Sequence, residues 1–115
     1  MTAGEREFIE QLVAAAAENG LPRTAARLLG HLLLAEEAKS LDELAEEAGV
    51  SKASVSLNAR WLEQLGIVQR LASPGDRRDY YRLAEEPWEP IFAMARRRIQ
   101  RFHCALSAGC RLLPP

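Results

Sequence analysis

Two short helical segments, over residues 40–49 and 51–66, follow each other with no room for a long loop between them. Ser40 followed by Glu43 matches a capping box, in which each side chain bonds to the backbone N–H of the other residue at the beginning of a helix. Gly49 suits the end of the first helix, because glycine adopts the left-handed conformation that is common there. The spacing therefore predicts a helix-turn-helix.

A turn signal between two short alternating segments predicts a β-hairpin over residues 67–84. Pro74 presets its φ angle and Gly75 supplies a positive φ, so the pair favours a tight turn. The tip of this hairpin carries two adjacent arginines, Arg77 and Arg78.

The rest of the chain is predicted to be helical over residues 5–20, 21–37 and 85–109, where apolar residues recur at helical spacing. Helix, helix, helix-turn-helix, hairpin and helix is the element order of a winged helix. We therefore predict a mainly α fold with a small β-hairpin wing, a winged helix-turn-helix with terminal dimerisation helices. In such a fold the second helix of the motif enters the major groove of DNA, and the wing lies along the phosphates or reaches a minor groove that attracts arginine.

Length and charge distribution fit one DNA-binding domain over residues 1–115. Residues 1–50 hold 4 Lys and Arg against 10 Asp and Glu, a balance of −6, whereas residues 51–115 hold 11 against 6, a balance of +5. The basic half would face a polyanion. The apolar runs are far shorter than the roughly 20 residues that span a bilayer, and residues 1–8 do not resemble a signal peptide, so we expect a cytoplasmic protein without a membrane partner.

The helix over residues 51–66 divides into a buried and an outward side. Helical geometry places Val55, Ala59 and Leu62 toward the core. The outward and flanking positions are small, apolar, hydroxyl-bearing, amide or basic: Ala53, Ser54, Ser56, Leu57, Arg60 and Gln64. This composition suits a DNA groove, because small residues allow close approach, Leu57 can contact a thymine methyl group and Arg60 can bind a guanine or a phosphate.

The beginning of that helix is a natural place for phosphate contacts. Lys52 and the backbone N–H groups of the first turn can bind phosphate oxygens. Ser51 also serves as an N-cap whatever the function, and Leu57 and Trp61 could instead pack on a neighbouring element. The alternative function is therefore a winged helix that binds other proteins and not specific DNA.

The last helix carries an apolar seam that indicates a partner helix. Its members are spaced 4, 3, 4, 3 and 4 residues apart: Trp88, Phe92, Ala95, Ile99, Phe102 and Leu106. Arg96, Arg97, Arg98 and Arg101 are interpreted as the solvated face of this helix, the alternative being a second phosphate contact. Trp88 and Tyr81 are expected to pack between the wing and the last helix.

Residues 41–81 resemble the MarR superfamily of bacterial regulators and look closest to the branch typified by GbsR, the regulator of glycine-betaine synthesis. The resemblance covers about residues 20–85. The segments that carry the resemblance are DELAEEAGVSKASVS, LEQLGIV and PGDRRDYY. The resemblance implies a homodimeric, sequence-specific transcriptional regulator, which we interpret as a repressor binding a near-palindromic operator in double-stranded DNA. It also implies that Asp76 braces the wing by pairing with an arginine.

The same resemblance assigns roles along the chain. DNA contacts are implied at Ser51, Lys52, Ala53, Ser54, Ser56, Leu57 and Asn58, and at the wing residues Arg77 and Arg78. Residues 1–20 and 87–113 become dimerisation helices around a core of residues 21–86, with contacts at Phe8, Leu12, Trp88, Phe92, Ala95, Ile99, Phe102 and Leu106. Typical members bind a small-molecule effector between the dimer base and the DNA-binding lobes, and the single helix after the wing leaves less material for such a pocket here.

Catalysis and metal binding are not indicated. There is no nucleophile beside a base and no phosphate-binding glycine loop, so we predict no enzyme and no cofactor. Cys104 and Cys110 lie on different faces of one helix, about 9 Å apart along its axis, which excludes a disulfide within the helix. We interpret them as two thiols in a reducing compartment, with pairing across a dimer or a redox switch as alternatives.

Overall fold

The computed structural model describes residues 1–114, and the prediction of a mainly α fold is confirmed. The elements within this range are α1 (Ala3–Glu18), α2 (Arg23–Leu34), β1 (Lys39–Ser40), α3 (Leu41–Ala48), α4 (Lys52–Gln64), β2 (Val68–Ala72), β3 (Asp79–Leu83) and α5 (Trp88–Cys110). The second helix, expected to reach Glu37, ends at Leu34 because the chain turns there toward β1.

The core lies where α1, α3 and α4 surround α2. Seven of the twelve residues of α2 are buried, which is the pattern of a central helix rather than of a surface helix. Ile9 and Val13 of α1 face it from one side, and Leu44 of α3 and Leu62 of α4 close it from the others. Because α1 contributes to this core, the folded core extends beyond residues 21–86 and the N-terminal helix is part of the folded body.

The helix-turn-helix forms as predicted. Glu43 N–H donates to Ser40 Oγ and Ser40 N–H donates to Glu43 Oε1, both at 3.1 Å, so the capping box is complete. The bond from the Ser40 N–H holds the pKa of Glu43 below its ordinary value. Gly49 ends α3 at φ 69°, in the left-handed region that other residues rarely adopt, and its N–H donates to Ala45 O at 3.0 Å. This turn directs the chain into α4 three residues later.

The hairpin is confirmed, but the sheet has a third strand that the sequence analysis missed. The strand order is β1-β3-β2, and β1 pairs Lys39 with Tyr81 and Ser40 with Tyr80 in antiparallel register. Two residues are too few to produce an alternating pattern, and Ser40 was already explained as a helix cap. The sheet is therefore joined to the beginning of α3, which fixes the tip-side half of β3 to the helix-turn-helix.

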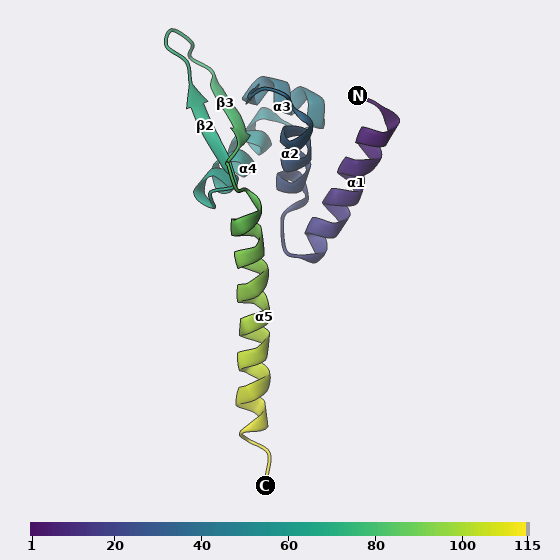
Figure 1. Cartoon of the computed structure of the whole chain (residues 1–115), viewed down its shortest axis with the longest axis vertical. Helices are drawn as coiled ribbons and strands as arrows, with labels where there is room; N and C mark the ends of the chain where they lie inside the picture. The colour runs from purple at the N-terminus through teal and green to yellow at the C-terminus, as the bar shows by residue number, and fades with distance from the viewer. Residues whose placement is uncertain (115) are drawn as a thin grey trace.

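Helix α5 leaves the body at the base of the wing and extends away from it (Figure 1). Only its first turns contact the body, where Ile91 and Met94 pack against the core. The molecule is consequently elongated, with extents of 68 × 34 × 25 Å. No helix in the described range is both long enough and apolar enough to cross a membrane.

Candidate nucleic-acid interface

The outward face of α4 is exposed to solvent. Val55, Ala59 and Leu62 are at most 2% exposed, as helical geometry predicts. Leu57 on the other side keeps 69% of its surface exposed, a large value for a leucine in a helix that packs well. Trp61 is half-buried against the core, so packing explains Trp61 but not Leu57. Ala53 and Arg60 are also exposed, and Ser54 and Ser56 lie at the margins.

The N-terminus of α4 combines a cap with a charged side chain. Ser51 Oγ accepts a hydrogen bond from Ser54 N–H at 3.1 Å, which leaves the Ser51 hydroxyl proton available to an outside acceptor. Lys52 Nζ lies 3.3 Å from Asp42 Oδ1 of α3. The Asn58 amide donates to Ser54 O at 2.8 Å, so this side chain turns back onto its own helix and offers less to a ligand than the others.

The wing tip is a tight turn held together by Asp76. Asp76 N–H donates to Ser73 O at 3.0 Å across Pro74-Gly75, with Gly75 at φ 82°. The Asp76 carboxylate accepts from the Arg78 N–H at 2.9 Å and from the Tyr80 hydroxyl at 2.8 Å. These bonds, the first above all, hold the pKa of Asp76 below its ordinary value. The Arg78 guanidinium also approaches Asp76, at 3.4 Å, so the expected pairing with an arginine is present.

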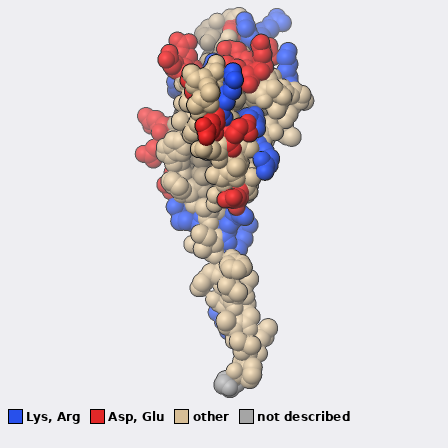
Figure 2. All heavy atoms as spheres, turned by 90° about the vertical axis from the view of Figure 1, so that its right-hand side faces the viewer, with Lys and Arg blue, Asp and Glu red and all other residues tan. Residues whose placement is uncertain are grey.

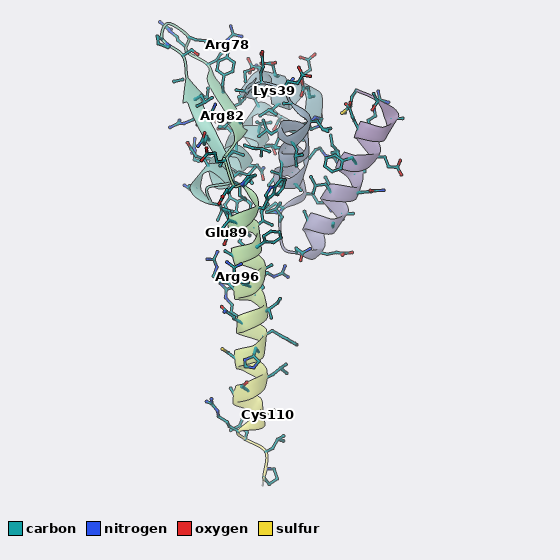
Figure 3. The ribbon with its side chains drawn as sticks, in the orientation of Figure 1. Lys39, Arg78, Arg82, Glu89, Arg96 and Cys110 are labelled. Carbon is teal, nitrogen blue, oxygen red and sulfur yellow. The ribbon has the colours of Figure 1, made fainter. Side chains whose placement is uncertain are left out.

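The wing is tied to α4 by charged side chains that the sequence analysis did not single out. Arg70 of β2 lies 3.4 Å from Glu63 at the end of α4 and 4.0 Å from Asp79 of β3. Arg82 Nε donates to Gln69 Oε1 across the two strands at 3.1 Å. Arg78 lies in the turn just before β3, and Arg82 lies farther along β3 (Figure 3). The register of β2 on β3 places Arg82 beside Gln69 and Arg70 near Asp79, whereas the Arg70–Glu63 pair depends on how α4 meets the sheet. Neither could be derived from the residues alone.

The predicted seam of α5 is largely open to solvent. The exposed fractions are 45% for Trp88, 57% for Phe92, 69% for Ile99, 68% for Phe102 and 55% for Leu106. Ala95 is half-buried, as are Phe8 and Leu12 of α1, which pack against the core of their own chain. A contiguous exposed apolar stripe of this kind is typical of a surface that is covered by a partner.

The expectation for Trp88 and Tyr81 was wrong in part. Tyr81 is 4% exposed and belongs to the core. Trp88 instead lines a hollow of about 270 Å³ between α1, α2 and α5, together with Leu12, Leu21 and Phe92. Trp88 is the first residue of α5, and the hollow places its side chain with residues of α1.

The arginines of α5 form a band between the body and the projecting apolar part of the helix. Figure 2 shows this basic band and a largely uncharged stretch beyond it. Arg96 donates to Glu89 Oε1 at 3.1 Å, and the Arg98 guanidinium lies over Gly20 at the α1–α2 turn. Both thiols of the helix, Cys104 and Cys110, are exposed.

Comparison with known proteins identifies the chain at the level of a family. A family model described as "MarR family" matches residues 19–79, more than half of the chain, and this range contains the helix-turn-helix and most of the wing. The chain belongs to the MarR family. The mostly helical fold with a small antiparallel sheet also matches MarR-type winged helices in solved structures.

The individual relatives that this chain matches are transcriptional regulators and not enzymes. HTH-type transcriptional regulator MmpR5 of Mycobacterium tuberculosis is 46% identical over 78 residues, which are 67% of this chain and 47% of that protein. HTH-type transcriptional repressor OpcR of Bacillus subtilis is 28% identical over 89 residues, 74% of this chain and 48% of the relative. The crystal structure of a transcriptional regulator superposes with a TM-score of 0.72 at 36% identity, covering 94% of this chain and 74% of that one. The chain spans about half the length of the curated relatives it matches.

Proposed function

We propose that the protein is a sequence-specific regulator of transcription that binds double-stranded DNA as a homodimer and acts as a repressor in the cytoplasm. The observation that carries the proposal is the outward face of α4. On this face Leu57 is mostly exposed, and its neighbours are small or carry hydroxyl groups. An exposed leucine is not stabilised by water, but it can contact the thymine methyl groups in a major groove. Membership of the MarR family supports this use.

The contacts to DNA divide into two kinds. Leu57 and Arg60 would meet base edges, because they lie on the outward face of the helix that enters the groove. Ser51, Lys52, Arg77 and Arg78 would meet phosphates or the minor groove, so they contribute affinity to all sequences alike. Ala53, Ser54, Ser56 and Asn58 complete the proposed contact surface.

The seam of α5 would form the dimer. Its exposed aromatic and aliphatic side chains recur every 3.5 residues on average, which is the spacing of a coiled coil. A second copy of the same helix is the simplest partner for such a surface. Phe8 and Leu12 would add the part of their surface that the core leaves open. Two copies of α4 would then lie in successive major grooves of a near-palindromic operator.

We propose that a small-molecule effector would bind in the apolar hollow between α1, α2 and α5. Its walls are mostly aliphatic and aromatic, which favours an apolar small molecule. We also assign the chain to the GbsR-like branch of the family, on the resemblance of its helix-turn-helix and of the wing segment PGDRRDYY.

Selection of bound sequences from a random duplex pool at physiological salt tests the function. Enrichment of an inverted repeat is the expected result and would provide the operator. Binding without enrichment would contradict sequence specificity. A complete lack of binding would favour the alternative of a winged helix that binds proteins.

A further inference from the structure

Four basic side chains are proposed to contact DNA: Lys52, Arg60, Arg77 and Arg78. Two of them already form an ion pair with a carboxylate of the same chain. Arg78 pairs with Asp76 on the wing, and Lys52 pairs with Asp42 across the helix-turn-helix at 3.3 Å. The side chains of Lys52 and Asp42 keep 70% and 58% of their surface exposed, so solvent and an outside anion can reach both. For Arg60 and Arg77, residues 1–114 provide no ion-pair partner within 4.0 Å.

The two carboxylates differ in what else they do. Asp76 accepts two further hydrogen bonds that stabilise the wing turn, so it has a structural role that is independent of DNA. Over the described residues, the only side-chain interaction of Asp42 is with Lys52. Asp42 is the second residue of α3, where any acidic residue gains a modest interaction with the helix dipole, but that gain does not require Lys52 nearby.

We propose that Asp42 competes with DNA phosphate for Lys52 and thereby lowers the affinity of the protein for DNA in general. The inference rests on the proposed DNA-binding function and concerns its regulation. A carboxylate and a phosphate oxygen offer an ammonium group the same kind of partner, so Lys52 must exchange one for the other on binding. A cation that is already neutralised also contributes less counterion release.

The consequence for function lies in the affinity for DNA as a whole, whereas the ratio between operator and random DNA stays the same. Phosphate contacts strengthen binding to every sequence equally, and a regulator must find its site among many competing sequences. Weakening one phosphate contact in the free protein reduces the time spent on random DNA. Base contacts through α4 are unaffected, because Asp42 lies on α3 and pairs with the first residue of α4.

Asp42→Asn compared with Glu46→Gln tests the proposal. Both residues are exposed on α3 and both changes remove one negative charge, but Glu46 has no ion pair within residues 1–114. Binding is measured by fluorescence anisotropy on a labelled duplex of mixed sequence, between about 50 and 200 mM salt. We expect Asp42→Asn to bind about two- to fivefold more tightly at the low-salt end, the range of an exposed pair, and Glu46→Gln to change less. The salt slope of Asp42→Asn should steepen by up to about 0.9.

A Lys52→Gln background separates pairing from general repulsion. There, Asp42→Asn should have no larger effect than Glu46→Gln, because the ammonium group for which Asp42 competes is gone. Equal gains from Asp42→Asn and Glu46→Gln in the parent chain, or a full gain from Asp42→Asn without Lys52, would overturn the proposal. Partial loss of folding cannot imitate the expected result, since it weakens binding.

The same titrations distinguish this inference from the function on which it rests. Wild-type protein that binds the duplex, weakens with Lys52→Gln and does not respond to Asp42→Asn would overturn the competition and leave DNA binding in place. Wild-type protein that does not bind any duplex would overturn both.

Discussion

At the scale of single residues, the proposed interface separates side chains that hold the structure from side chains that are free to bind. Ser51, Asn58 and Asp76 each have a hydrogen bond within the chain that explains them without DNA. Leu57 has no such explanation, since 69% of its surface is exposed. Exposure without an internal partner is the feature that best marks a residue for an external ligand.

Leu57→Ala and the double change Arg77→Ala with Arg78→Ala should therefore act differently. Loss of Leu57 should change the preferred base at one position of each half-site, by about 1–3 kcal/mol of discrimination at most. Loss of the two arginines should weaken binding to all sequences and reduce the salt slope by about 1 for each phosphate that is no longer neutralised. Parallel selections from a random pool measure both effects. Unchanged preference in Leu57→Ala would contradict base contact by α4.

Residue types and spacing predicted much of this site, and the remainder depended on register. Helical periodicity was sufficient to sort Val55 from Leu57, because one face of α4 had to be buried. The ion pairs of Arg70 with Glu63 and Asp79 could not be predicted from the sequence, because they depend on the alignment of β2 on β3 and on the angle between the sheet and α4. The pairing of Lys52 with Asp42 likewise depends on how α3 and α4 cross.

At the scale of elements, the capping box joins α3 to the sheet, because Ser40 is both the N-cap and the last residue of β1. Ser40→Ala removes the acceptor of the Glu43 N–H in a site that is 2% exposed. We expect a loss of about 0.5–2 kcal/mol in the free energy of unfolding. Chemical denaturation measures it, with Thr2→Ala, a cap at the exposed beginning of α1, as a comparison that should cost less.

The seam of α5 makes a second prediction at this scale. Phe102→Asp should shift the protein toward monomer, because it places a charge between Ile99 and Leu106 in the apolar stripe that the partner helix would cover. Gln100→Asp introduces the same side chain on the same helix at an exposed position outside the seam and should leave the dimer intact. Sedimentation at micromolar concentration measures both. A monomeric wild-type protein would contradict dimerisation through α5.

At the scale of the whole molecule, a buried histidine links stability to pH. His31 of α2 is 6% exposed and its Nδ1 lies 3.8 Å from Glu47 Oε2, with Arg27 and Lys39 also acting on it. Burial lowers the pKa of His31 below its ordinary value of 6.5, and the attraction of Glu47 only partly opposes this. The unfolded chain therefore takes up the proton more readily than the folded one, so this contribution to stability is complete above about pH 6.5 and is lost as the pH falls below it.

His31→Gln should flatten the dependence of the unfolding free energy on pH between about 6.5 and 5, since the replacement does not titrate. His103→Gln, at an exposed position on α5, should leave the dependence unchanged. Denaturant titrations over this pH range measure the slope, which a general loss of stability does not alter. An unchanged slope in His31→Gln would show that the buried imidazole is not the group responsible.

The length of α5 turns small angles into large displacements. A helix of 23 residues measures about 35 Å, and it meets the body only through its first turns. A rotation of about 10° at Trp88 would move the far end by about 6 Å, which is roughly a sixth of the spacing of about 34 Å between successive major grooves. In a dimer joined along α5, the angle between α5 and the body would therefore set the distance between the two α4 helices. That distance would in turn determine which operator lengths the protein can span.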